Sequence, residues 1–340
     1  MPPIRIVING FGRIGRTVLR QILTTPGHDD IEVVAINDIA PRETCTYLFK
    51  YDSVYGPCPL SVELRGDQLC IGDHIVPVWS KSDLSKSDLS GVDLVLECTG
   101  RAVTRDVAEA GLAAGAAAVL ISGPSPAADV TVVLGANTLD LGTARIVSNA
   151  SCTTNAIAPL LRAIDLGLGI ERAHITTIHC YTGSQPTVDV PGPSLERSRA
   201  AAVSMIPTTT SAADQITQVL PEFLGRLSVS AVRVPSLSVS AIDAVIQVAE
   251  DCEERLGEFI EEAFENDPFV GLTHDACVST DMRGRSESLV IATRETVVIQ
   301  HKQLRLFGWY DNEWGFSARM IDMTRRIAAR DAKRAKVGSS

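Results

Sequence analysis

The stretch "IRIVINGFGRIG" (4–15) decides the fold of the first half of the chain. Its first six residues form a short β-branched run, typical of a buried strand, and the run ends at a glycine-rich turn. The helical pattern "RTVLRQILTT" (16–25) follows, and a second strand-like run, "IEVVAIND", occupies 31–38. Strand, glycine-rich turn, helix and strand in this order are the context in which G-x-G-x-x-G binds a dinucleotide.

Three glycines and one acid of this unit have distinct expected roles. Gly10 permits the tight turn, Gly12 lets a pyrophosphate approach the backbone, and Gly15 lets the helix pack on the strand. The helix N-terminus offers free N–H groups to the phosphates. Asp38 ends the second strand, where a carboxylate accepts the ribose hydroxyls and repels a 2′-phosphate. We therefore expect NAD as the cofactor, with use of NADP left open.

Further short apolar runs follow at 92–97, 117–122, 130–135 and 144–148. Continuous apolar runs of this length are typical of parallel strands covered on both faces. Between the second strand and these runs, residues 60–78 have the pattern of a meander. The first 150 residues are therefore predicted to form a doubly wound sheet.

Length, composition and charge limit the classes of protein. A chain of 340 residues suggests two domains, and 45% hydrophobic with 21% charged residues is an ordinary globular balance. The formal net charge of −10 discourages binding to nucleic acids or acidic membranes. No run reaches the roughly 18 apolar residues of a membrane span, and the N-terminus has no signal-peptide pattern. We expect a cytoplasmic protein with neither nucleic-acid nor membrane partners.

The eight cysteines are scattered without a C-x-x-C pair, and the six histidines do not lie at zinc-ligand spacing from them. In a cytoplasmic protein this pattern predicts reduced thiols and no metal site.

One cysteine differs from the rest. In "IVSNASCTTNAIAPLL" (146–161) a strand-like run stops, and a helical pattern begins at Cys152. A helix N-terminus lowers the pKa of a thiol, and the thiolate is the nucleophile. The strand-like run "HITTIHCYT" (174–182) contains His179, whose imidazole could accept the thiol proton, whereas Cys180 should point to the opposite face. We predict a Cys152–His179 catalytic pair, against the alternative of an inert buried cysteine in a capped helix.

The motifs "INGFGRIGR", "SNASCTTN", "HCYT", "AVRVP" and "WYDNEWG" together resemble those of the glyceraldehyde-3-phosphate dehydrogenase family. The resemblance runs in order over nearly the whole chain. It implies an α/β fold with a Rossmann NAD-binding domain over 1–151 and a catalytic domain with a mixed, largely antiparallel sheet over 152–315. A C-terminal helix over 316–340 would return to the first domain. It also implies a homotetramer that functions in glycolysis.

The resemblance assigns cofactor contacts to particular residues. Arg13 and Ile14 match the pyrophosphate-binding turn, and Asp38 matches the ribose acid. Ser122 matches a residue near the middle of the cofactor, and Asn312 matches the residue that holds the nicotinamide carboxamide.

The resemblance also implies catalytic roles and two anion sites. Cys152 matches the nucleophile and His179 the base. Thr182 and Arg233 match the site for the substrate phosphate. Ser151, Thr153 and Thr210 match the site for the attacking inorganic phosphate. Arg199 matches an arginine that lies near both sites.

The implied reaction is oxidation of glyceraldehyde 3-phosphate to 1,3-bisphosphoglycerate with NAD and inorganic phosphate. Cys152 would carry a thiohemiacetal and then a thioester. A Cys–His hydrolase could use the same pair but would not need the nucleotide turn. A non-enzymatic NAD-binding regulatory protein is a further alternative.

Some positions depart from the family pattern. Pro186 stands where lysine is usual, the loop at 186–194 is longer, and Ser211 stands where glycine is common near the phosphate pocket. Such features are similar to those of the sister enzyme erythrose-4-phosphate dehydrogenase, which hydrolyses its thioester. That enzyme is the second expectation for the activity.

Overall fold

The computed structural model describes the backbone of residues 2–338 and the side chains of residues 2–334. The chain divides into two compact units. The first contains Met1–Val132, Thr138–Ala150 and Ser317–Ser340, and the second contains Val133–Asn137 and Ser151–Phe316.

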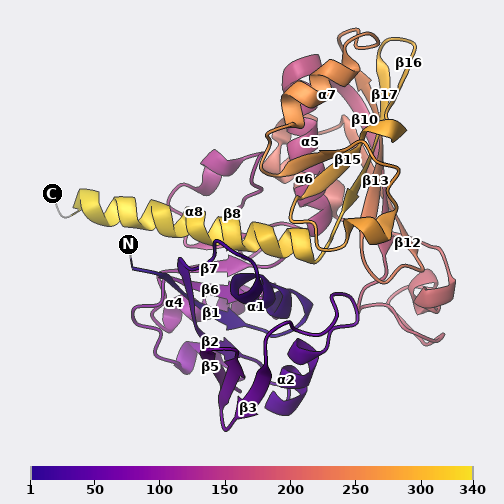
Figure 1. Ribbon diagram of the computed structural model, residues 1–340. Coiled ribbons are helices and arrows are strands. Elements are labelled where there is room, and N and C mark those ends of the chain that lie inside the picture. The colour runs from indigo at the N-terminus through magenta and orange to yellow at the C-terminus, as the bar shows by residue number, and fades with distance from the viewer. Residues whose placement is uncertain (1, 339–340) are drawn as a thin grey trace. The chain divides into compact units, whose positions relative to one another are not determined.

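The first unit is built on a nine-stranded sheet in the order β3-β4-β5-β2-β1-β6-β7-β9-β8 (Figure 1). Its strands are β1 (Ile4–Asn9), β2 (Ile31–Asn37), β3 (Val62–Arg65), β4 (Gln68–Ile71), β5 (His74–Trp79), β6 (Leu94–Glu97), β7 (Ala118–Ile121), β8 (Val130–Thr131) and β9 (Ile146–Ser148). The central strand β1 pairs in parallel with β2 and β6. Strands β3, β4 and β5 form the antiparallel meander predicted over 60–78.

Burial explains the apolar runs of these strands. Ile6, Val7 and Ile8 of β1 are fully buried, as the prediction of a sheet covered on both faces requires. The run predicted as a strand over 130–135 is shorter, because β8 ends at Thr131 and the next residues leave the sheet. Val133 donates its backbone N–H to the side chain of Asn137 and so closes a turn.

The helices of the first unit are α1 (Arg13–Thr24), α2 (Arg42–Lys50), α3 (Arg105–Ala108), α4 (Ala110–Ala113) and most of α8 (Trp314–Gly338). Within this unit, Arg325 of α8 forms an ion pair with Asp30, with a shortest distance of 2.7 Å. Arg330 of α8 donates to the backbone carbonyl of Ala144 at 2.6 Å. The end of the chain therefore returns to the nucleotide-binding sheet, as predicted.

The second unit contains an eight-stranded sheet in the order β11-β12-β10-β13-β17-β15-β14, with β16 paired to β17. Its strands are β10 (Ile170–Cys180), β11 (Ile206–Thr208), β12 (Leu227–Val234), β13 (Ser240–Val248), β14 (Val270–Thr273), β15 (Leu289–Ala292), β16 (Val297–Ile299) and β17 (Gln303–Tyr310). Only the β10–β12 and β14–β15 pairs are parallel. The predicted mixed, largely antiparallel sheet is confirmed.

The helices of the second unit are α5 (Cys152–Leu168), α6 (Ala212–Val219) and α7 (Leu256–Phe264). Most of α5 is buried, and it ends at Gly169, whose φ of +65° suits a residue without a side chain. Across the described residues, no helix is both long and apolar enough to cross a membrane. All eight cysteines are free thiols.

Candidate active site

Cys152 is the first residue of α5, as predicted from the sequence. The side chain of Ser151 caps the helix, because its Oγ accepts the backbone N–H of Thr154 at 3.1 Å. A cap of this kind satisfies one of the free donors of the first turn and fixes where the helix begins. Cys152 as a whole residue is only partly buried.

His179 lies at the end of β10 and faces this thiol. The Sγ atom of Cys152 is 3.7 Å from Nε2 of His179. The imidazole is 5% exposed, and its ring meets that of Tyr310 edge to face at 6.0 Å between centroids. The structure thus brings together the two residues that the sequence predicted as a pair.

Burial and the neighbouring Arg233 lower the pKa of His179 to about 4. The Nδ1 atom lies 2.7 Å from the carbonyl oxygen of Cys180 and 2.6 Å from Nη1 of Arg233. In the tautomer with the proton on Nδ1, both Nδ1–H and Nη1 of Arg233 donate to the Cys180 carbonyl oxygen, so the Nδ1–Nη1 approach is a contact between two donors and not a hydrogen bond. This tautomer leaves the Nε2 lone pair directed at Cys152. At neutral pH the imidazole is therefore uncharged and able to accept a proton.

Arg233 reaches His179 because β10 and β12 pair in parallel with His179 directly opposite Arg233. Its Nη1 also donates to the carbonyl oxygen of Cys180 at 3.0 Å. A guanidinium fixed at this distance supplies positive charge to the space next to the thiol.

The pKa of Cys152 differs from the sequence-based prediction. Burial raises the pKa of the thiol, although the Thr153 hydroxyl and the charge of Arg233 act in the opposite direction. The start of the helix acts in the predicted direction, since the backbone N–H groups of Cys152 and Thr153 lower the pKa, but desolvation of the thiolate outweighs them and the net shift is upward. The resting pair is a thiol beside a neutral imidazole.

Tyr310, at the end of β17, is a site residue that the sequence analysis missed. Its hydroxyl lies 3.0 Å from Oγ1 of Thr153 and 2.7 Å from Oγ1 of Thr177. Thr153, expected in an anion site, thus has its hydroxyl bonded within the protein. These contacts join α5, β10 and β17 and hold the Cys152–His179 pair in place. Its place in "WYDNEWG" was the available signal.

Asn312 follows β17 and is buried, with its amide held by two donors. The thiol of Cys180 donates to Oδ1 of Asn312 at 3.1 Å, and the hydroxyl of Ser240 donates to the same oxygen at 3.4 Å. Burial raises the pKa of the Cys180 thiol to about 12, so the S–H donor persists at neutral pH. Val239, with a φ of +65°, is a strained β-branched residue that precedes Ser240.

The remaining residues expected in the anion sites are engaged locally. Oγ1 of Thr210 accepts the backbone N–H of Ala212 at the start of α6. Oγ1 of Thr182 lies 3.0 Å from Oγ of Ser184. Arg199 is 65% exposed at its side chain and forms an ion pair with Asp189 at 2.8 Å. Hydrogen bonds of Thr182 and Arg199 within the described residues do not reach the Cys152–His179 pair.

Gln215 of α6 is a second residue that the sequence analysis missed. Its Oε1 accepts the backbone N–H of Ser151 at 2.9 Å and the hydroxyl of Thr154 at 3.2 Å. Its Nε2 donates to Oγ of Ser211 at 2.7 Å. A single glutamine in an amphipathic helix carries no local signal of such a contact.

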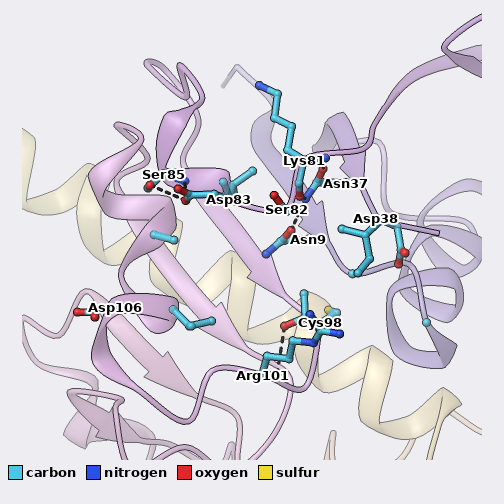
Figure 2. A pocket seen from close by; sticks show the side chains of 17 residues that line it. Asn9, Asn37, Asp38, Lys81, Ser82, Asp83, Ser85, Cys98, Arg101 and Asp106 are labelled. Carbon is cyan, nitrogen blue, oxygen red and sulfur yellow. Dashed lines mark hydrogen bonds between the residues drawn. The ribbon is translucent and has the colours of Figure 1, made fainter. Parts of the chain in front are cut away.

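The first unit contains a cavity of about 610 Å³ at the carboxyl ends of β1, β2 and β6 (Figure 2). Its lining includes Gly10, Gly12, Asp38, Lys81, Cys98 and Arg101. The position follows the rule that ligands of open α/β sheets bind beyond the carboxyl ends of the strands.

The glycine-rich turn fits a dinucleotide. Gly10 has a φ of +95°, and a Cβ atom there would lie 2.6 Å from the backbone of Cys98. A Cβ on Gly15 would lie 2.1 Å from the carbonyl oxygen of Gly10. A Cβ on Gly12 would have no atom within 4 Å, so this glycine leaves open space for a pyrophosphate. Gly10 and Gly15 thus have the turn and packing roles predicted for them, and Gly12 leaves the open space that its predicted role requires.

Asp38 both binds the turn and lines the cavity. Its Oδ2 accepts the backbone N–H of Phe11 at 2.6 Å, and its Oδ1 accepts that of Ala40 at 2.8 Å. A carboxylate has about four lone-pair sites, so each oxygen retains acceptor capacity for a ribose hydroxyl.

Of three further residues expected near the cofactor, two lie in the first turn of α1 and the third follows β7. Arg13 is the first residue of α1, and its guanidinium forms an ion pair with Asp52 at 2.5 Å. Ile14 follows it in the first turn of the helix. Ser122 lies just past β7, and its backbone N–H donates to the carbonyl oxygen of Glu97 at 3.0 Å.

The side chains between these strands form a buried polar network, visible in part in Figure 2. Asn9 donates to Glu97 at 2.5 Å and accepts from Asn37 at 2.8 Å. Oδ1 of Asn37 in turn accepts the backbone N–H of Lys81 at 2.8 Å. Burial raises the pKa of Glu97 against the effect of its donors. The network holds the ends of β1, β2 and β6 in register under the cavity.

The fold and these residues define an NAD-dependent oxidoreductase with a cysteine–histidine pair. Residues 4–105 match the family model "Glyceraldehyde 3-phosphate dehydrogenase, NAD binding domain", and residues 151–312 match that of the C-terminal domain. The chain belongs to the glyceraldehyde-3-phosphate dehydrogenase family, and its cofactor is NAD.

Several relatives bear the name glyceraldehyde-3-phosphate dehydrogenase. The protein from Xanthobacter flavus is 45% identical over 94% of this chain and 97% of its own length. That from Pseudomonas aeruginosa strain PAO1 is 44% identical over 96% and 98%. That from Geobacillus stearothermophilus is 39% identical over 96% and 99%. The similarity therefore extends over both units.

Proposed function

We propose that this protein oxidises glyceraldehyde 3-phosphate to 1,3-bisphosphoglycerate, with NAD as the hydride acceptor and inorganic phosphate as the second substrate. The observation that carries the proposal is the 3.7 Å contact between the Cys152 thiol and a neutral His179 at the start of α5. Family membership supports the substrate, since the relatives are named for it.

The first chemical step joins Cys152 to the aldehyde. Sγ forms a bond to the carbonyl carbon while the thiol proton passes to Nε2 of His179 and then to the new hydroxyl group. The product is a thiohemiacetal on Cys152. A neutral imidazole suits this transfer because it accepts the proton at the moment the sulfur becomes nucleophilic.

The second step oxidises the thiohemiacetal to a thioester. Nε2 of His179 accepts the hydroxyl proton as a hydride leaves the same carbon. Bound NAD supplies the acceptor for that hydride. His179 then releases this proton to solvent. An oxygen of inorganic phosphate attacks the thioester carbon, the C–S bond breaks, and the acyl phosphate leaves Cys152 as the thiolate, which takes up a proton to restore the resting thiol.

Roles for the other residues belong to the same proposal. Thr182 and Arg233 would bind the substrate phosphate, and Arg199 would act near both anion sites. Ser151, Thr153 and Thr210 would surround the attacking phosphate. Asn312 would donate from Nδ2 to the nicotinamide carboxamide, because its Oδ1 already faces Cys180 and Ser240. Asp38 would accept the ribose hydroxyls. Arg13 and Ile14 would lie at the pyrophosphate and Ser122 near the middle of NAD.

We also propose the division into an NAD-binding domain (1–151), a catalytic domain (152–315) and a returning helix (316–340), and a cytoplasmic homotetramer. Exposed apolar residues support assembly, since Leu195 is 90% exposed on the loop that follows β10. Light scattering of the purified protein measures the number of subunits, and a monomeric mass would contradict the tetramer.

A second candidate is oxidation of erythrose 4-phosphate with water as the acyl acceptor. One observation favours it: Oε1 of Gln215 accepts the backbone N–H of Ser151, beside the residues that would bind the attacking phosphate.

The experiment that tests the function measures NADH formation with each aldehyde, with and without inorganic phosphate. We expect faster turnover with glyceraldehyde 3-phosphate and a rate that rises with phosphate. A preference for the four-carbon aldehyde with no phosphate dependence would favour the second candidate, and no NADH with either would contradict both.

A further inference from the structure

Gln215 connects α6 to the start of the catalytic helix α5. Its side chain is 7% exposed, and both ends of its amide are used. Oε1 accepts the Ser151 N–H and the Thr154 hydroxyl, while Nε2 donates to Ser211. Because a glutamine amide can rotate and a backbone N–H can only donate, the Ser151 N–H fixes Oε1 toward Ser151 and leaves Nε2 to donate to Ser211.

The contact lies one residue before the nucleophile. The first backbone N–H groups of a helix and its positive dipole end are favourable to an anion. Here a neutral amide oxygen already takes the N–H of Ser151. The Ser151 hydroxyl is also engaged, at 2.7 Å from Oγ1 of Thr154. An anion that used the Ser151 N–H would have to displace Oε1 of Gln215, and one that used the Ser151 hydroxyl would compete with Thr154.

We propose that Gln215, held by Ser211, sets the choice of acyl acceptor by competing with inorganic phosphate for the Ser151 N–H beside Cys152. Phosphate therefore binds weakly, and water takes a larger share of the acyl enzyme than it would with this N–H free. The inference rests on the proposed function, since it assumes a Cys152 thioester that phosphate attacks.

The two fates of the thioester are chemically parallel. In phosphorolysis a phosphate oxygen bonds to the carbonyl carbon and the C–S bond breaks, which releases an acyl phosphate. In hydrolysis a water oxygen bonds to that carbon, its proton passes to His179, and the C–S bond breaks to release a carboxylic acid. Both return the thiolate to Cys152, so Gln215 changes the partition without changing the oxidation.

The test uses the full-length protein with Gln215→Ala. The KM for phosphate is measured in the NADH assay, and products are separated into acyl phosphate and acid. A second measurement needs no turnover: inorganic phosphate is titrated as a protectant of Cys152 against alkylation by iodoacetamide. Gln218→Ala is the matched control, because Gln218 is exposed on the same helix.

Loss of one buried hydrogen-bond competitor is expected to lower the KM for phosphate and the half-protecting concentration by roughly 2- to 10-fold. The share of acid product should fall, and kcat at saturating phosphate should stay within about 2-fold. Ser211→Gly releases Nε2 of Gln215 and should shift both values in the same direction by a smaller factor. It also serves as the second variant if Gln215→Ala fails to fold. Gln218→Ala should change neither.

The outcomes separate this inference from the proposed function. If the wild type depends on phosphate while Gln215→Ala and Ser211→Gly change neither KM nor protection, the inference is wrong and the function stands. If phosphate neither accelerates nor protects any variant, the inference and the phosphate-dependent reaction are both wrong. Phosphate dependence that appears only in Gln215→Ala would support the inference and assign hydrolysis to the wild type.

Discussion

The low pKa of His179 should make the folded protein sensitive to acid, and His179→Asn should remove that part of the sensitivity. Burial and Arg233 hold the pKa at about 4 in the folded state, against an ordinary value of 6.5. Between pH 6.5 and 4, His179 is therefore mostly protonated in the unfolded chain and mostly neutral in the folded protein. The free energy of unfolding falls as the pH is lowered from 6.5 toward 4, and this group contributes little further loss below 4.

The two pKa values set the size of the effect. At pH 5 the imidazole is almost fully protonated in the unfolded chain and about nine-tenths neutral in the folded protein. Since a tenfold ratio corresponds to about 1.36 kcal/mol, the wild type should lose about 2 kcal/mol between pH 7 and pH 5 through His179 alone. Near pH 4 the loss approaches about 3 kcal/mol.

The assay is urea denaturation of wild type and His179→Asn at pH 7, 6, 5 and 4.5, followed by tryptophan fluorescence. Other titrating groups, including His28 with its lowered pKa, are common to both proteins and cancel in the difference. The variant should gain about 2 kcal/mol relative to wild type on going from pH 7 to 5. A difference that stays constant with pH would show that His179 is not held neutral by its surroundings.

Three more predictions address the chemistry and the cofactor. Cys152→Ser should abolish NADH formation while NAD still binds in a calorimetric titration, because a serine hydroxyl stays protonated at neutral pH. Substantial remaining activity would contradict the assignment of Cys152 as the nucleophile. Asp38→Ala should lower the ratio of catalytic efficiency with NAD to that with NADP about 10-fold or more, since two ribose hydrogen bonds to a charged group are lost. Asp38→Asn, which keeps an acceptor for Phe11 or Ala40, separates cofactor choice from the stability of the turn, and an unchanged ratio in both variants would contradict the ribose contact. Cys180→Ala should weaken NAD binding roughly 2- to 5-fold but leave ADP-ribose binding unchanged, because the lost S–H bond orients Asn312 toward the nicotinamide. Cys180→Ser, which keeps a donor, should retain the affinity for NAD. Equal weakening of NAD and ADP-ribose binding would show only a general loss of packing.

The parts that the sequence predicted depend on local patterns. Gly10 and Gly15 are recognisable because turn geometry and close packing exclude a side chain there, and Gly12 completes the G-x-G-x-x-G spacing between them. Strand β10 and the start of α5 follow from alternation and from a capping serine. The family motifs added the roles of the residues that these elements carry.

The parts that the sequence did not predict depend on contacts between distant segments. Tyr310 meets Thr153 across more than 150 positions of chain, and Gln215 meets Ser151 across about 60. The hydrophobic periodicity of a sequence carries no information on contacts between such distant residues. The net direction of the Cys152 pKa was not predicted for a related reason: the helix start that lowers the pKa is visible in the sequence, whereas the desolvation that outweighs it is not.

The parallel pairing of β10 with β12 has a consequence for how this site can change over time. Residues 173–180 and 227–234 pair one to one, and a slip of one residue would turn every side chain of β12 to the other face of the sheet. A deletion or insertion inside β12 would thus remove Arg233 from His179 at once. The segment between β10 and β11 is under no such restriction, since it begins after the register is set. During evolution the segment between β10 and β11 can change in length and sequence, and its contacts can change with it, while the Cys152–His179 pair is kept.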